Sequence, residues 1–168
     1  MNRWLRILKH RWLDEADARR ALGPETLKRL QARVAQSERG HSGEIRICVE
    51  AGLPLSYLWR NATPRERAVT MFGKLRVWDT EYNNGVLIYL LLAEHAIEIV
   101  ADRGLNRHVS TEQWRELTAG MADAFRRGDY EGGLTAAVDA VGQMLDRHFP
   151  SVGPEANPNE LPDAPVVQ

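Results

Sequence analysis

Residues 86–92 form a run that is apolar at nearly every position, and only Tyr89 carries a polar side-chain atom. A β-strand with no polar face has to be covered on both sides, because neither set of alternating side chains suits contact with water. The run therefore predicts the central strand of a sheet that has helices packed on each face. This requirement places the chain in the α/β class.

Turn signals bound this strand on both sides. Residues 83–85 (Asn-Asn-Gly) precede it, and asparagine and glycine favour tight turns. Residues 94–95 then make a short connection to a second apolar segment, residues 97–100. So short a connection permits only a hairpin, so we expect these two strands to be antiparallel.

An earlier strand is predicted at residues 44–50, where isoleucine and valine alternate with other side chains and give one better-buried face. A loop containing Pro54 is expected next. Residues 63–66 (Thr-Pro-Arg-Glu) then form a capping box, which starts a helix. A strand–helix–strand connection within one sheet makes its two strands parallel. The predicted sheet is therefore mixed.

Four more helices are indicated. Residues 2–22 carry one helix or two short ones, and Pro24 begins another that ends near Gly40. A second capping box at residues 110–113 and an N-cap at Asp129 begin the last two helices, whose apolar residues recur at spacings of three and four. The predicted element order is α-α-β-α-β-β-α-α.

The chain divides into three predicted parts. Residues 1–40 are expected to hold helices that pack on or precede the domain, and residues 41–149 to form the α/β domain itself. Residues 150–168 contain five of the eight prolines and no aromatic residue. A segment with so little apolar surface does not offset the entropy lost on ordering. We therefore expect a disordered tail whose removal leaves stability nearly unchanged.

Composition excludes several classes of protein. The formal net charge of −1 over 168 residues gives no argument for a nucleic-acid partner. A domain of this size needs no metal or disulfide to fold, and its single cysteine, Cys48, is expected to be buried in a reducing compartment. No apolar run approaches the roughly 20 residues that span a bilayer. Basic residues interrupt the apolar N-terminal residues, so we expect no signal peptide and a cytoplasmic location.

Residues 3–13 form a basic amphipathic stretch in which tryptophan, leucine and isoleucine are interspersed with arginine and lysine. Such a helix can lie on an anionic membrane, with its tryptophans at the level of the headgroups. Alternatively, its apolar side packs on the domain while its basic side chains stay in solvent. Peripheral membrane contact and docking on the domain therefore both remain open.

Oxygen-bearing side chains are expected to gather at one edge of the sheet, where the first two strands begin and the third ends. Carboxylate and amide oxygens are the ligands that calcium and magnesium prefer. The spacing is not that of an EF-hand, and the same residues can instead cap a helix end and a tight turn. The candidate cation ligands are Glu44, Asp79, Asn83, Asn84 and Asp102, with Glu81 and Arg103 beside them.

Other catalytic patterns are absent from the sequence. None of the five histidines stands at a zinc-type spacing with Cys48. No GxSxG motif, phosphate-binding loop or dinucleotide fingerprint occurs. Residues 102–104 and His108 could bind a phosphate. Ser110 could serve a helix N-terminus that attracts an anion, although a plain helix cap is the simpler interpretation.

The residues around the central strand resemble those of the TPM domain family, formerly a domain of unknown function. The similarity is carried by residues 77–92 (VWDTEYNNGVLIYLLL) and 98–105 (EIVADRGL), with further matches at 41–45 (HSGEI) and 125–130 (FRRGDY). The resemblance implies a three-layer α/β/α sandwich over roughly residues 37–149. The chain most resembles the short bacterial branch that lacks a signal peptide and a membrane anchor.

Relatives in this family include thylakoid lumen proteins linked to photosystem II repair and an animal accessory protein of acetylcholine receptors. Weak acid phosphatase activity and divalent-cation binding are attributed to some members. The resemblance therefore implies that the edge with Asp79, Asn83, Asn84 and Asp102 is the functional site.

Two functions from different classes remain. The first is a binding or accessory module, whose polar edge or helix face recognises a protein partner. A membrane-associated protein is one such partner. The second is a weak metal-assisted acid phosphatase, in which the cation polarises a phosphoryl oxygen and Asp79 or Asp102 ligates it or acts on it. The sequence offers no nucleophile placed beside its base, which favours the binding module.

Overall fold

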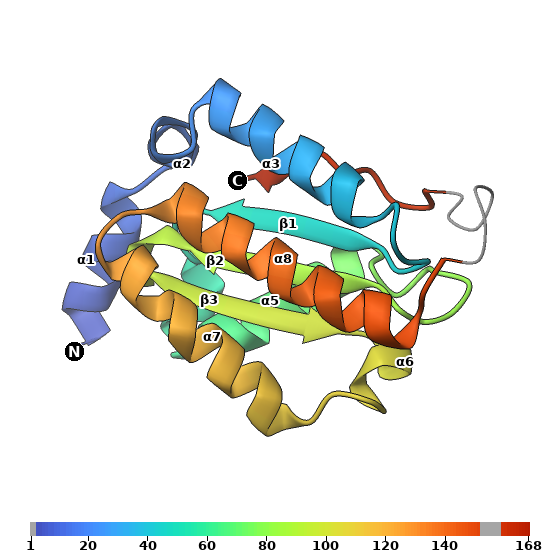
Figure 1. Cartoon of the computed structure of the whole chain (residues 1–168). Helices are drawn as coiled ribbons and strands as arrows, with labels where there is room; N and C mark the ends of the chain where they lie inside the picture. The colour runs from blue at the N-terminus through green and yellow to red at the C-terminus, as the bar shows by residue number, and fades with distance from the viewer. Residues whose placement is uncertain (1–2, 152–158) are drawn as a thin grey trace.

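A four-stranded sheet lies at the centre of the computed structural model, which describes residues 3–151 and 159–168 (Figure 1). Its strand order is β3-β2-β1-β4. β1 (Ile45–Glu50) runs parallel to β2 (Val86–Leu91), and β3 (Ala96–Ala101) is antiparallel to β2. The mixed sheet, the parallel crossover and the hairpin are therefore as predicted.

Helices cover both faces of the sheet (Figure 1). Alternate residues of β2, namely Val86, Ile88 and Leu90, pack with the helices of one face, α2 (Glu15–Ala21), α3 (Pro24–Ser37), α7 (Thr111–Arg126) and α8 (Tyr130–His148). The other three, Leu87, Tyr89 and Leu91, pack with α5 (Pro64–Lys74) and α4 (Leu55–Trp59). All six β2 residues are buried, which confirms the central strand and the three-layer α/β/α sandwich.

The predicted capping residues begin the helices as expected. The Thr63 and Ser110 hydroxyls each accept a hydrogen bond from the backbone N–H three residues ahead, at Glu66 and Gln113. Asp129 does the same for Gly132 and begins α8. These bonds satisfy amides that a helix start otherwise leaves without a partner. The N-terminal segment forms two short helices, α1 (Arg3–Trp12) and α2.

Three short helical elements are additions to the predicted element order. α4 follows Pro54, the 3₁₀ helix η1 (Leu92–Glu94) fills the β2–β3 connection, and α6 (Arg103–Asn106) follows Asp102. Each is only three to five residues long. That is too short to show the apolar periodicity by which a helix is recognised.

β1 differs from its prediction, because all six of its residues are buried and not one face only. Its polar side chains find partners from distant parts of the chain. Glu50 accepts hydrogen bonds from Arg67 Nε of α5, at 3.0 and 2.9 Å, and from the Tyr89 hydroxyl at 2.5 Å. Arg46 donates to the carbonyl oxygens of Pro162 and Ala164. Hydrogen bonds of this kind offset the several kcal/mol that burial of a charged group otherwise costs, although Arg46 Nε has no partner among the described residues.

The predicted disorder of residues 150–168 is wrong for residues 159–168; residues 152–158 lie outside the described chain. β4 (Val166–Val167) pairs parallel with β1, and Gln168 exchanges hydrogen bonds of 2.9 Å with Ala51 and Val49. Without this segment β1 would expose a row of unpaired backbone groups as an edge strand. Backbone pairing with β1 therefore orders the tail, together with the burial of Leu161 among the core residues of one sheet face.

No helix within the described ranges is long and apolar enough to cross a membrane.

Candidate functional site

Three strand ends converge at one edge of the sheet, as the predicted topology requires. Glu44 directly precedes β1, Asn83 and Asn84 precede β2, and Asp102 directly follows β3. The backbone N–H of Asp102 donates to the Gly85 carbonyl at 2.9 Å, which continues the β2–β3 ladder by one residue.

Asn83 and Asp102 lie in two loops that contact each other closely. The Gly104 N–H donates to the Asn83 carbonyl at 2.8 Å, and Arg103 Nε donates to Asn83 Oδ1 at 3.3 Å. A Cβ atom at position 104 would lie only 2.4 Å from the Asn83 carbonyl oxygen, so this approach requires glycine. Asn83 itself adopts a positive φ of 52°, which asparagine tolerates better than most residues.

Asp102 has one carboxylate oxygen in use and one without a partner. Its Oδ1 accepts a hydrogen bond of 2.7 Å from the Arg103 N–H, and the residue is the N-cap of α6. Its Oδ2 is buried and has no hydrogen-bond partner in the described structure. A buried oxygen in this condition is costly, and such groups in folded proteins are usually satisfied by a water or an ion.

Asn84 shows the same pattern. Its backbone N–H donates to Thr80 Oγ1 at 3.1 Å, and its Nδ2 donates to Ser42 Oγ at 3.2 Å. Its Oδ1, however, is buried and unpaired within the described chain. The contacts thus divide the edge into two halves, Asn83 with the Asp102 loop and Asn84 with Ser42.

Glu44 lies apart from these two groups in its bonding. Its Oε1 and Oε2 accept hydrogen bonds of 3.1 Å from the backbone N–H groups of Glu160 and Leu161. Burial raises the pKa of the Glu44 carboxyl, against the lowering effect of these two bonds. Glu44 therefore binds the backbone of the C-terminal segment.

Asp79 and Glu81 lie on the turn before β2 and are exposed. The backbone N–H of Asp79 donates to the Arg76 carbonyl at 2.9 Å, and that of Glu81 donates to the Glu160 carboxylate at 3.0 Å. Across residues 3–151 and 159–168, no three His, Cys, Asp or Glu side chains are grouped to hold a metal. A cation at this edge would consequently depend on asparagine oxygens, backbone carbonyls and water as well as carboxylates.

A small cavity of about 290 Å³ adjoins the Asn83–Asp102 half of the edge. Two arginines line it, and Arg107 is one that the sequence did not single out. Their guanidinium groups suit an anion such as phosphate. The lining residues are Tyr82, Asn83, Arg103, Gly104 and Arg107.

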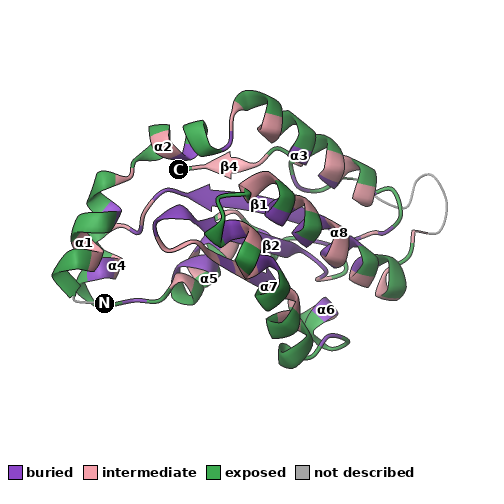
Figure 2. Cartoon of the chain, turned by 60° about the vertical axis from the view of Figure 1, so that its left-hand side comes forward, coloured by how far each residue is buried: buried purple, intermediate pink, exposed green. Residues whose placement is uncertain are grey.

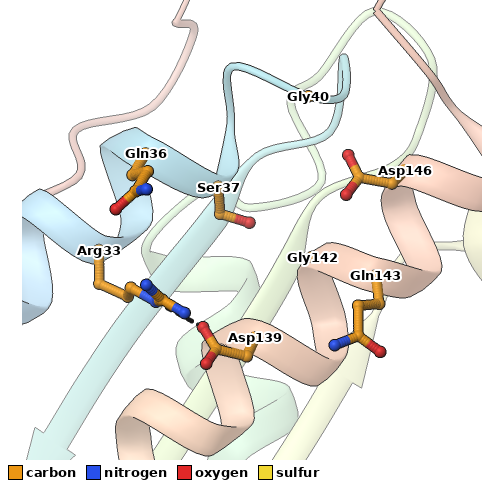
Figure 3. Close-up of a pocket in the computed structure, with 8 residues that line it drawn as sticks. All are labelled: Arg33, Gln36, Ser37, Gly40, Asp139, Gly142, Gln143 and Asp146. Atoms are coloured by element: carbon orange, nitrogen blue, oxygen red, sulfur yellow. Dashed lines mark hydrogen bonds and ion pairs between the residues drawn. The ribbon is translucent and has the colours of Figure 1, made fainter.

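A second cavity, of about 300 Å³, lies between α3 and α8 (Figure 3). The ion pair of Arg33 Nε with Asp139 Oδ1, at 2.5 Å, joins the two helices there. Ser37 also lines this cavity, and its hydroxyl lies 3.1 Å from His41 Nε2. The complete lining is Arg33, Gln36, Ser37, Gly40, Asp139, Gly142, Gln143 and Asp146.

The Ser37–His41 contact has the polarity of a nucleophile with its base. His41 Nδ1 lies 3.0 Å from the Gly43 carbonyl, which can only accept, so Nδ1 carries the proton and the Ser37 hydroxyl donates to Nε2. Burial lowers the pKa of His41, which favours the neutral imidazole. The hydroxyl is nevertheless packed against α8, since a Cβ at Gly142 would lie 2.2 Å from Ser37 Oγ. We therefore assign the pair a structural role; its only signal in the sequence was the spacing of four residues.

Comparison with known proteins agrees with this architecture. The NMR structure of BA42 from the psychrophilic bacterium Bizionia argentinensis superposes with a TM-score of 0.74 at 27% identity, covering 86% of this chain and 94% of BA42. The N-terminal domain of a P. gingivalis protein superposes with a TM-score of 0.62 at 20% identity, covering 76% and 78%.

No curated protein matches the sequence. The family profile described as TPM domain matches residues 16–144, which includes every strand of the sheet except β4. The expected resemblance is thus confirmed over most of the chain, and the protein belongs to the TPM domain family.

Proposed function

We propose that this protein is a binding module that takes a divalent cation, Ca²⁺ or Mg²⁺, at the sheet edge and presents it to a protein partner. The observation that carries the proposal is the buried Asp102 Oδ2, which has no hydrogen-bond partner among the described residues. A hard cation would coordinate such an oxygen. Its remaining coordination positions would be open to water or to a ligand from the partner.

Asp79, Asn83 and Asn84 supply the remaining side-chain oxygens of the proposed site, and Asn83 Oδ1 would exchange its long bond of 3.3 Å from Arg103 for the cation. Glu44 is left out, because both of its carboxylate oxygens already accept backbone hydrogen bonds. With few carboxylates and the Arg103 guanidinium nearby, affinity should be weak, with a Kd of about 10⁻⁴ to 10⁻³ M.

Calorimetric titration with CaCl₂ and MgCl₂ tests the proposal through two variants with opposite effects. Asp102→Asn keeps the helix cap, since asparagine caps as well as aspartate, but removes the charge, so the Kd should rise by about tenfold. Arg103→Gln removes a cation that donates to Asn83 Oδ1, so affinity should increase. Asp123→Asn on α7 is the control for loss of one carboxylate charge away from the sheet edge.

Two results would count against the site. One is a wild-type titration with no saturable heat for either cation. The other is an Asp102→Asn protein that binds as the Asp123→Asn control does.

A weak metal-assisted acid phosphatase is the second candidate, and the two arginines in the cavity beside Asn83 favour it. In this function the cation at Asp102 would polarise a phosphoryl oxygen while Arg103 and Arg107 hold the others. Hydrolysis of an activated phosphate ester should then scale with protein and be lost in Asp102→Asn, Asp79→Asn and Arg107→Gln. If all three variants kept the wild-type rate, the activity would come from a contaminant. We expect little turnover, since none of the described residues that line this cavity pairs a nucleophile with a base.

A further inference from the structure

Helix α1 is attached to the domain through its polar side. Arg6 Nε lies 2.7 Å from Glu94 Oε1, and Arg6 Nη2 donates to the Ala62 carbonyl at 2.7 Å. His10 is almost completely buried, and its Nδ1 accepts a hydrogen bond of 2.9 Å from the Leu53 N–H. Its Nε2 lies 2.9 Å from the same Glu94 oxygen. The sequence-based alternative, in which the apolar side packs on the domain, is therefore wrong for most of this helix.

The opposite side of α1 is apolar and faces solvent. Trp4, Leu8 and Trp12 recur every four residues and Leu5 lies beside them, so all four share one face of the helix. Trp4 is 65% exposed and Trp12 is 79% exposed, and the helix is mostly exposed in Figure 2. Soluble domains rarely expose this many large apolar side chains side by side unless the patch binds a partner or a membrane.

Helix α4 extends this surface. Trp59 makes an edge-to-face contact with Trp4, with 6.2 Å between the ring centroids, and Leu55 is also exposed. Arg3 lies 5.1 Å above the Trp59 ring, which further ties the two helices together. We call this surface the tryptophan face, and it consists of Trp4, Leu5, Leu8, Trp12, Leu55 and Trp59.

The exposed charged side chains of α1 are all positive. Arg3, Lys9 and Arg11 are exposed on α1, and Arg60, which forms an ion pair of 2.9 Å with Glu66, is exposed at the end of α4. Residues 3–12 contain no acidic residue. The chain as a whole has a formal net charge of −1, so this basic character is local. A surface that combines tryptophans, leucines and flanking cations is complementary to an anionic lipid headgroup layer.

We infer that the tryptophan face docks on an anionic membrane surface. Trp4, Trp12 and Trp59 lie at the headgroup level, Leu5 and Leu8 enter the acyl boundary, and the basic side chains contact the lipid charges. Because Arg6 and His10 already hold α1 in place, docking does not require a helix to form on the membrane, and the ordering cost of binding is small. A lipid surface fits better than a protein groove, since the cations flank the apolar stripe on both sides.

Co-sedimentation of the full-length chain with vesicles tests this inference. Phosphatidylcholine vesicles are compared with phosphatidylcholine–phosphatidylglycerol vesicles, in the presence of a chelator so that no cation bridges protein and lipid. The chain should sediment with the anionic vesicles only, and added salt should release it. The double variants Trp4→Ser/Trp12→Ser and Lys9→Glu/Arg11→Glu should each lose about tenfold or more in vesicle affinity.

Trp78→Ser is the matched control, because Trp78 is also exposed but precedes β2, at the opposite end of that strand from Glu94. It should bind vesicles as wild type does. The variants leave Arg6 and His10 intact, and circular dichroism verifies that they stay folded. The inference is overturned if wild type ignores anionic vesicles at low salt, or if Trp4→Ser/Trp12→Ser binds them equally well. It is also overturned if sedimentation without lipid shows a dimer that this double variant dissociates.

Discussion

The Glu44 carboxylate accepts a hydrogen bond of 3.1 Å from the Leu161 backbone N–H and so fastens the start of β1 to the C-terminal segment. A buried carboxylate that loses such donors keeps its desolvation cost without compensation. Together with the β1–β4 pairing, this contact makes the tail part of the folded domain.

Deleting residues 152–168 should therefore lower the Tm by roughly 5 °C or more, which corresponds to about 2 kcal/mol for a domain of this size. Thermal unfolding followed by circular dichroism measures the change. Leu161→Ala, which leaves the backbone donors in place, should have a smaller effect. A truncated chain with the wild-type Tm would show that the tail contributes nothing.

Arg67 and Glu50 form a buried ion pair beneath α5. Hydrogen bonding to Glu50 raises the pKa of Arg67, so the guanidinium stays charged. Arg67→Met should cost about 3–5 kcal/mol, because it leaves the Glu50 carboxylate buried without its cation. The double variant Glu50→Gln/Arg67→Met should recover much of this loss in urea denaturation. The exposed pair Arg115–Glu112 is the control, and Arg115→Met should cost less than about 1 kcal/mol. Equal costs at the two sites would contradict this account.

The buried Glu38 carboxyl should make the stability of the protein depend on pH. Its Oε1 accepts a hydrogen bond of 2.8 Å from the Ile45 N–H, and burial raises the pKa of its carboxyl from 4.5 to about 8. Between these values the folded protein keeps a proton that the unfolded chain releases. The contribution of Glu38 to stability should therefore be full below about pH 4.5 and be lost as pH rises toward 8, by an amount on the order of a few kcal/mol.

Glu38→Gln keeps the acceptor for Ile45 but cannot titrate. Its unfolding free energy, measured by urea denaturation at about pH 5 and about pH 8, should decline less than that of wild type. The difference between the two proteins isolates Glu38 from Glu44, whose raised pKa has the same sign. Parallel pH profiles would show that Glu38 is ionised in the folded protein.

The buried His10 side chain should contribute measurably to the stability of α1 on the domain. In His10→Ala the buried Leu53 N–H loses its acceptor, and Glu94 loses one of its two partners. The cost should be about 1–3 kcal/mol by chemical denaturation. Lys9→Ala, on the exposed side of the same helix, should cost less than about 0.5 kcal/mol. If both substitutions had the same small effect, α1 would not be anchored as described.

Local signals explain why much of the fold could be predicted from sequence. The apolar run of β2 requires cover on both faces, and the Thr63 and Ser110 capping boxes act within four residues of chain. The failures involve partners that are distant in sequence. Glu50 is buried because Arg67 and Tyr89 reach it, and two valines at the end of the chain pair with β1. No periodicity reveals such contacts.

The candidate site and α1 show the same limit. Topology brought the strand ends together, but the sequence did not reveal that Glu44 binds the tail or that Arg107 lines a cavity beside Asn83. For α1, the pattern indicated two faces without showing which one is buried. The carboxylate of Glu94, 84 residues from His10, decides that orientation.

Amide NMR during a calcium titration tests the cation site most directly. The amides of residues 79–85 and 102–104 should shift first and saturate together, and Asp102→Asn should suppress both groups of shifts. Asp79→Ala should weaken the response, and Arg103→Gln should move saturation to lower calcium. Shifts confined to residues 159–168, or an unchanged response in Asp102→Asn, would contradict a cation site at this edge.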